Sequence, residues 1–171
     1  MTKTAQPVGP GRTRESFGRH LEDFTVGDVY EHRPGRTISE TDNTWFTLLT
    51  MNTHPLHFDA EYAANSEFGG LVVNSALTLS IVAGMSVSDL SQKAVANLGW
   101  DNIKLTAPVF VGDTIYAESE ILTVRDSGSR PNHGIVAART TGMKADGTVF
   151  MTYERSMLVP KRGHAVDDKE G

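Results

Sequence analysis

The sequence contains no cysteine, and this absence excludes three kinds of chemistry. A chain without thiols cannot form disulfides, use a thiolate nucleophile or bind a metal through sulfur. Such a chain is compatible with a reducing compartment, so we expect a cytoplasmic protein.

Excess positive charge and long apolar runs are also lacking. The formal net charge is -5 and the pI is about 5.6, whereas nucleic acids and anionic membranes usually attract a basic surface. The longest apolar-leaning segment, residues 71–87, is interrupted by asparagine, serine and threonine, which makes it a poor membrane span. The sequence therefore predicts no nucleic-acid or membrane partner.

What the chain does have is enough length and apolar content for one domain. Its 171 residues are 39% hydrophobic and 22% charged. We expect a single domain over residues 20–160. Residues 1–19 are polar and predict a flexible lead, and residues 161–171 are charged and predict a flexible tail.

The first half of this domain reads as one strand followed by helices. We expect a strand at residues 29–33, a bend at Pro34-Gly35, and a helix that Ser39 caps and that ends near Met51. Pro55 then forces an irregular loop, and a short helix follows at residues 60–66. The longest helix is predicted at residues 75–90, where apolar residues recur at helical spacing.

The second half reads as strands. Residues 94–105, 114–125, 135–145 and 149–159 are rich in β-branched and aromatic side chains, and turn residues separate them. We expect an antiparallel meander of these four strands that wraps around the long helix. Such a sheet leaves an edge strand open, so we expect a homodimer or a higher homo-oligomer.

This element order, together with the stretch LTMNTHPLHFDAEYAANSEFGGLVVNSALT at residues 49–78, resembles the MaoC-like, or R-specific enoyl-CoA hydratase, family. The resemblance implies the α+β hot dog fold, an antiparallel sheet around a long central helix. The variant Met-Asn-Thr-His-Pro-Leu-His is similar to the mesaconyl-CoA hydratase, or β-methylmalyl-CoA dehydratase, subgroup. The implied activity is a hydratase or dehydratase that acts on an acyl-CoA thioester.

The resemblance also implies site residues. His57 takes the place of the family's catalytic histidine, and Asn52 falls where the family has its catalytic aspartate. Asn74-Ser75-Ala76 replace the family's His-Gly-Met, and Phe68-Gly69 match the segment before it. The residues expected to contact the substrate are His54, Phe68, Gly69, Asn74, Ser75, Ala76 and Arg130, with Arg33, Arg36 and Arg139 as further charges for the phosphates of coenzyme A. No cofactor is expected, because coenzyme A is part of the substrate; acyl-carrier protein is an alternative handle.

Hydration of an α,β-unsaturated thioester needs a base, a proton donor for the α-carbon, and stabilisation of the charge on the thioester oxygen. The imidazole of His57 is the natural base, because it exchanges protons near neutral pH. Asn52 can orient a group but cannot act as an acid. Either His57 handles both proton steps, or His54 or a carboxylate of the substrate supplies the second proton. We expect the first amides of the long helix, near residues 74–76, to face the thioester oxygen.

Asn52 suggests a hypothesis about the substrate. A mesaconyl or methylmalyl chain carries its own carboxylate, and an aspartate beside it would repel that charge.

Three other interpretations remain open. The fold also serves thioesterases, although residues 71–90 contain no carboxylate before Asp89. A non-catalytic acyl-CoA-binding subunit is the other alternative, and Asn52 keeps it open. A metal site at His54 and His57 is disfavoured because no third ligand is well placed, so we expect no metal.

Overall fold

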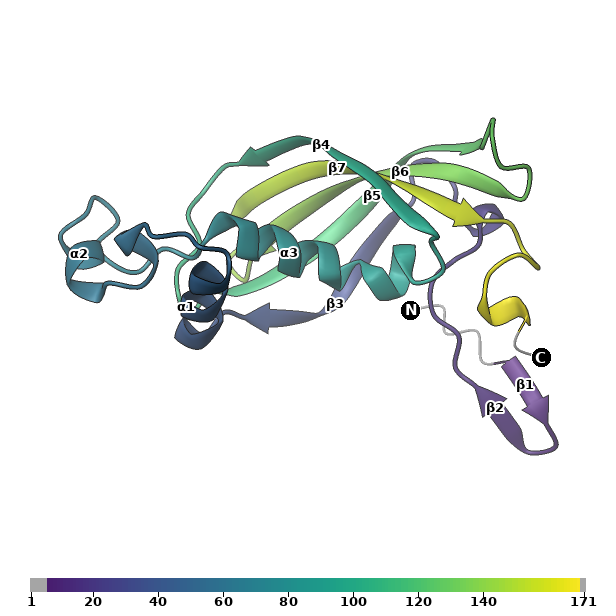
Figure 1. The fold of residues 1–171 in the computed structure, drawn as a ribbon, viewed down its shortest axis with the longest axis horizontal. Helices are drawn as coiled ribbons and strands as arrows, with labels where there is room; N and C mark the ends of the chain where they lie inside the picture. The colour runs from purple at the N-terminus through teal and green to yellow at the C-terminus, as the bar shows by residue number, and fades with distance from the viewer. Residues whose placement is uncertain (1–5, 170–171) are drawn as a thin grey trace.

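A five-stranded antiparallel sheet curves around one central helix in the computed structural model, which describes residues 6–169 (Figure 1). The strands lie in the order β3, β5, β6, β7 and β4. Their bounds are β3 Val29–Thr37, β4 Ala96–Leu105, β5 Thr114–Asp126, β6 His133–Lys144 and β7 Val149–Pro160. The predicted α+β hot dog arrangement is confirmed.

Within residues 6–169, three α-helices accompany the sheet: α1 (Glu40–Leu49), α2 (Ala60–Ala64) and α3 (Ser75–Met85). Ser39 caps α1 as predicted, because its hydroxyl accepts the amide of Asp42. The central helix is shorter than expected: after Met85 the chain changes to a π-helical turn, η3 (Val87–Ser91). Both Asp89 and Leu90 are buried in this wider turn.

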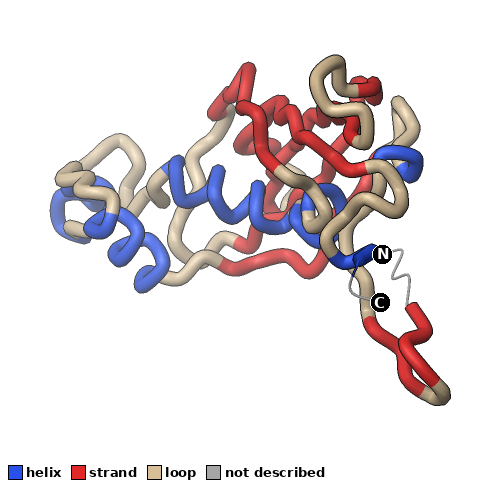
Figure 2. Tube along the Cα trace, turned by 45° about the vertical axis from the view of Figure 1, so that its right-hand side comes forward, coloured by secondary structure: helices blue, strands red, loops and turns tan. Residues whose placement is uncertain are grey.

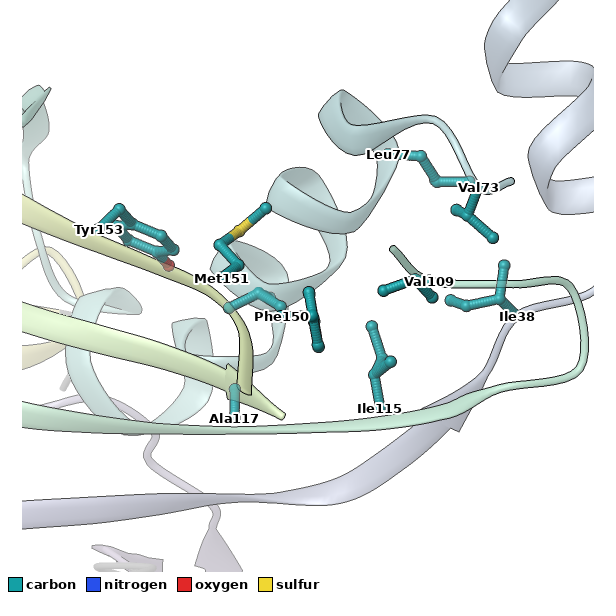
Figure 3. Close-up of a cluster of buried hydrophobic side chains, with 10 residues drawn as sticks. Ile38, Val73, Leu77, Val109, Ile115, Ala117, Phe150, Met151 and Tyr153 are labelled. Carbon is teal, nitrogen blue, oxygen red and sulfur yellow. The ribbon is translucent and has the colours of Figure 1, made fainter. Parts of the chain in front are cut away.

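The core lies between α3 and the inner face of the sheet, and Figure 3 shows the cluster at one end of it. Leu77 of α3 faces side chains from the end of β3, the start of β5 and the start of β7. A second cluster, built around Leu90 and Ile121, fills the other end of the sheet. Burial of these apolar side chains is the main stabilising contribution to the fold.

The predicted four-strand meander is wrong at β4. Short turns at residues 127–132 and 145–148 join β5, β6 and β7, so these three strands pair in chain order. The other edge of β5 pairs with β3. Because both edges of β5 are taken, β4 pairs instead with the free edge of β7, and residues 106–113 carry the chain from there across the end of the sheet to β5.

The expected bend at Pro34-Gly35 does not end its strand. β3 continues to Thr37 and absorbs the two residues as an irregularity in its pairing between His32 and Arg36. β3 lies at the edge of the sheet, where a missing amide donor can be tolerated.

Both terminal segments contain regular structure. Strands β1 (Gln6–Gly9) and β2 (Arg12–Arg14) form a hairpin that projects from the end of the molecule opposite α1 and α2 (Figures 1 and 2). The C-terminal segment ends in a 3-10 turn, η4 (Asp167–Lys169), and the imidazole of His20 lies 2.9 Å from Asp168 Oδ2. Residues 1–5 and 170–171 of the predicted lead and tail lie outside the described residues, and the domain boundaries stay a prediction.

Over residues 6–169, no helix has both the length and the apolar content that crossing a bilayer requires.

Candidate active site

The loop after α1 presents its histidines through a series of local hydrogen bonds. The side-chain oxygen of Asn52 accepts the amide of His54 at 2.9 Å, and the Nδ1 atom of His54 accepts the amide of Leu56 at 3.2 Å. Pro55 begins a 3-10 turn, η2 (Pro55–His57), in a position where a helical turn needs no amide donor. The result is a tight turn that ends on His57.

His57 is held by one ring nitrogen. Its Nδ1 lies 2.9 Å from the carbonyl oxygen of Val72. A carbonyl can only accept, so Nδ1 carries the proton and donates it. In the neutral ring Nε2 is then an acceptor, and no hydrogen-bond partner for it exists among residues 6–169. A half-buried imidazole with a free Nε2 can take a proton from water.

Asn43, which no sequence motif indicated, joins this loop to the central helix. Asn43 is fully buried on α1. Its Nδ2 donates to the carbonyl oxygens of His57 at 2.8 Å and Val72 at 3.2 Å, and its Oδ1 accepts the amide of Asn74 at 2.8 Å. Asn43 lies one turn before Phe46 and Thr47, on the inward side of the helix. A polar side chain on the inward side of a helix is the feature of the sequence that could have indicated a buried hydrogen-bonding role.

An apolar cavity of about 350 Å³ opens beside this loop. Its apolar lining includes Phe68, Val72, Val109 and Phe150. Three hydroxyl-bearing residues, Ser75, Thr78 and Thr106, also line it, and the two threonine hydroxyls donate to backbone carbonyls. Val72 connects the two features, because its side chain lines the cavity and its carbonyl holds the ring of His57.

The start of α3 offers fewer free amides than expected. Asn74 caps the helix, and its side-chain oxygen accepts the amide of Ala76 at 3.0 Å. The amides of Leu77 and Thr78 both bond to the carbonyl of Asn74. Of these four residues that follow the cap, Ser75 alone keeps an amide without a partner in the described part of the chain. Ser75 also lines the cavity, so its amide is the donor available there.

The structure brings most of the predicted residues to this end of the molecule. The rings of His54 and His57 lie 5.8 Å apart, and Phe68 lines the cavity. Gly69, with a φ of 67°, follows Phe68 in an exposed turn. The side chains of Asn52, His54 and Asn74 all bond to nearby backbone, which is the structural role that such residues often have in loops and caps.

The predicted phosphate-binding arginines do not gather at this site. Arg130 lies in the turn between β5 and β6, at the opposite end of the sheet from α1 and α2 (Figure 1). Arg33, Arg36 and Arg139 each pair with a carboxylate. Among residues 6–169, no hydrogen bond or ion pair joins one of these arginines to His57, and contact of Arg130 with substrate stays a prediction.

A second histidine cluster, also missed, lies under the far end of the central helix. The ring of His32 is fully buried, with Nδ1 at 2.9 Å from Asp89 Oδ2 and Nε2 at 2.8 Å from Ser119 Oγ. Ser119 in turn bonds to Thr140 at 2.8 Å. Burial lowers the pKa of His32, and its hydrogen bond to Asp89 opposes that shift. The cluster links β3, β5, β6 and η3.

The sequence is similar to a known family over most of its length. A family model described as mesaconyl-CoA hydratase matches residues 6–171. Mesaconyl-CoA hydratase of Cereibacter sphaeroides is 32% identical over 89% of the chain, which covers 44% of that protein. The chain thus spans less than half of this relative. An (R)-specific enoyl-CoA hydratase of Rhodospirillum rubrum is 31% identical over 75% of the chain and is 84% covered.

Solved structures agree with these sequence matches. A MaoC-like dehydratase from Rhodospirillum rubrum superposes with a TM-score of 0.75 at 26% identity, covering 85% of this chain and 99% of that one. A Mycobacterium tuberculosis protein with a double hot dog fold has the same TM-score at 23% identity, over 87% of this chain and 47% of that one. The second match supports the fold alone.

Proposed function

Because the chain belongs to the mesaconyl-CoA hydratase family of MaoC-like hot dog proteins, we propose that it is a hydro-lyase. It adds water to the double bond of a 2-enoyl thioester of coenzyme A, or removes water from the matching 3-hydroxyacyl thioester. The observation that carries the proposal is the state of His57: Nε2 is open, and Nδ1 is fixed on the carbonyl of Val72, a residue that lines the apolar cavity.

In the hydration direction, His57 Nε2 takes a proton from water while the water oxygen forms a bond with the β-carbon. The electrons of the double bond move toward the thioester oxygen, where the free amide of Ser75 stabilises the negative charge. A proton then goes to the α-carbon and restores the thioester. His57 can return the proton that it took, or His54 or a substrate carboxylate can supply one, and Asn52 orients this loop.

The acyl chain occupies the apolar cavity, and the thioester lies at its mouth between His57 and Ser75. Phe68 lines this cavity, and we expect its neighbour Gly69 and the helix start at Asn74 and Ala76 to contact the substrate as well. Coenzyme A is part of the substrate, so the reaction needs no separate cofactor. The names of the relatives include mesaconyl-CoA, a branched dicarboxylic substrate that is one candidate here, and acyl-carrier protein is an alternative handle.

A homodimer in the cytoplasm is the assembly that we propose. Strand β4 is an edge strand, and it exposes apolar side chains: Trp100 is 45% exposed and Leu105 is 58% exposed. Pairing of β4 with β4 of a second copy would extend the sheet and cover them. Light scattering of the purified protein would measure the mass of the assembly.

A substrate screen tests the proposed function. The protein is incubated with crotonyl-CoA, mesaconyl-CoA and the matching 3-hydroxyacyl-CoAs, and the absorbance of the enoyl thioester is followed with time. A hydro-lyase changes this absorbance in both directions without releasing free thiol. Thiol release would indicate a thioesterase instead, and binding without any turnover would indicate an acyl-CoA-binding subunit.

The structure supports the thioesterase alternative less well. Asp89, the first carboxylate after residue 71 in the helical region, is bonded to the buried ring of His32. It lies in η3, beyond the end of α3, whereas the cavity lies at the start of α3.

A further inference from the structure

Asn43 holds three backbone groups that come from three different parts of the candidate active site. Its side chain bonds to the carbonyl of His57, the carbonyl of Val72 and the amide of Asn74. These partners belong to the histidine loop, to the segment that lines the cavity and to the cap of α3. No other described side chain joins all three.

The orientation of the Asn43 amide follows from its partners. The two carbonyls can only accept and the amide of Asn74 can only donate, so Nδ2 must face the carbonyls and Oδ1 must face Asn74. Asn43 is fully buried, and without it these backbone groups would lose partners in a place from which water is excluded.

The carbonyl of Val72 receives two donors, Asn43 Nδ2 and His57 Nδ1. It therefore decides which nitrogen of His57 carries the proton. A carbonyl that is fixed in place keeps the proton on Nδ1 and leaves Nε2 as the acceptor. If Val72 could rotate, the ring could adopt the other tautomer and Nε2 would no longer accept a proton.

We propose that Asn43 is a positioning residue for the hydration reaction: by fixing the carbonyls of His57 and Val72, it sets the tautomer and the placement of the catalytic imidazole. This inference rests on the proposed function. It extends that function to a residue that does not contact the substrate and acts only through His57.

Leucine and aspartate are the informative replacements, because both have about the volume of asparagine. Asn43→Leu removes all three hydrogen bonds. Asn43→Asp keeps an oxygen that can accept the amide of Asn74, but its carboxylate cannot donate to either carbonyl. Ser119→Ala is the matched control, because Ser119 is also fully buried and also makes two side-chain hydrogen bonds, in the distant His32 cluster.

The first measurement needs no activity. Nitrogen-15 NMR of the imidazole reports which ring nitrogen is protonated. In the unmodified protein at neutral pH, His57 should be the Nδ1-H tautomer; the Nε2-H tautomer would overturn the inference, whether or not the protein turns over any substrate. Both Asn43 variants should show a mixture of tautomers, and Ser119→Ala should keep the original one.

The second measurement is the rate with the best substrate from the screen. Small misplacements of a catalytic group cost up to about 100-fold in rate, so kcat should fall about 10- to 100-fold in both Asn43 variants while KM changes little. Ser119→Ala should keep its kcat. Folded Asn43 variants with an unchanged tautomer and an unchanged kcat would overturn the inference. Absence of turnover in the unmodified protein would instead contradict the proposed function, and the NMR result would still decide the role of Asn43.

Discussion

His57 and His32 are the same side chain in the same tautomer, yet their surroundings differ at one atom. Each carries its proton on Nδ1 and donates it, His57 to a carbonyl and His32 to a carboxylate. The difference is at Nε2. The Nε2 atom of His32 is hydrogen-bonded to the hydroxyl of Ser119, whereas the Nε2 atom of His57 has no partner in the described part of the chain.

This difference separates a group that can exchange protons from one that cannot. Both ring nitrogens of His32 are hydrogen-bonded in a fully buried cluster, so these bonds serve to join the strands to η3. The ring of His57 is half-buried and is anchored by one nitrogen only, on the carbonyl of Val72, which lines the cavity. A catalytic imidazole needs one ring nitrogen bonded to a fixed partner and the other nitrogen free. When both nitrogens are hydrogen-bonded within the protein, the same ring has a structural role.

The largest expected effect is the loss of turnover in His57→Ala. General acid–base catalysis is worth about 100- to 10,000-fold, so kcat/KM should fall by that factor. The melting temperature should change little, because the ring makes one hydrogen bond at the surface of the loop. Retention of more than about a tenth of the activity would contradict the role assigned to His57.

Substitution of the other histidine should have the reverse result. In His32→Ala, the side chain of Asp89 loses its buried partner, and breaking a buried pair costs about 3–5 kcal/mol of unfolding free energy. Chemical denaturation measures this loss. The fraction that remains folded should keep its kcat, since His32 lies beneath the end of the helix opposite the cavity. A loss of kcat equal to that of His57→Ala would contradict the purely structural role of His32.

The sequence allowed the fold to be predicted because the fold depends on local signals. Alternating apolar residues and turn residues located β4 to β7 within a few positions, and Ser39 marked the start of α1. The place of β4 in the sheet was missed, because strand pairing depends on which edges remain open and not on the strand's own residues.

The site was predicted only in part for a related reason. His57 stands in a motif, so the sequence identified it. Asn43, His32 and Ser119 have partners at distances of 14 to 87 positions along the chain. The position of Asn43 on the inward side of its helix indicates burial, but it does not indicate which distant backbone groups the side chain contacts. The place of Arg130 could not be predicted either, because it depends on which end of the sheet the turn between β5 and β6 occupies.

A smaller effect should appear in the pH dependence of stability. Burial lowers the pKa of His32 in the folded state below its ordinary value of 6.5, although Asp89 opposes the shift and Arg155 and Arg33 add to it. Between 6.5 and the lowered pKa, the unfolded chain binds a proton at this residue that the folded protein does not bind. The contribution of His32 to the free energy of unfolding therefore has its full value above pH 6.5. It is lost as the pH falls through the pKa of the folded state.

Denaturation curves between pH 7.5 and pH 5 would measure this loss. The comparison variant is His32→Gln, which cannot titrate at that position. The unfolding free energy of the unmodified protein should decrease more steeply with falling pH than that of the variant. Equal slopes in the two proteins would mean that His32 does not contribute to the pH dependence.

The smallest effect is expected for Asn52→Asp, which changes charge near the open histidine without changing shape. The oxygen of Asn52 that accepts the amide of His54 would be replaced by a carboxylate oxygen that accepts it equally well, so stability should stay within about 0.5 kcal/mol. In a solvent-exposed loop, the repulsion between the new charge and a substrate carboxylate 4 Å away should be about 1 kcal/mol. This repulsion corresponds to a roughly fivefold lower kcat/KM. Activity on mesaconyl-CoA should therefore fall relative to activity on crotonyl-CoA. A rise in the ratio of mesaconyl-CoA activity to crotonyl-CoA activity would show that Asn52 does not serve to avoid repulsion of a dicarboxylic substrate. The site beside Nε2 of His57 would then be suited to an uncharged acyl chain.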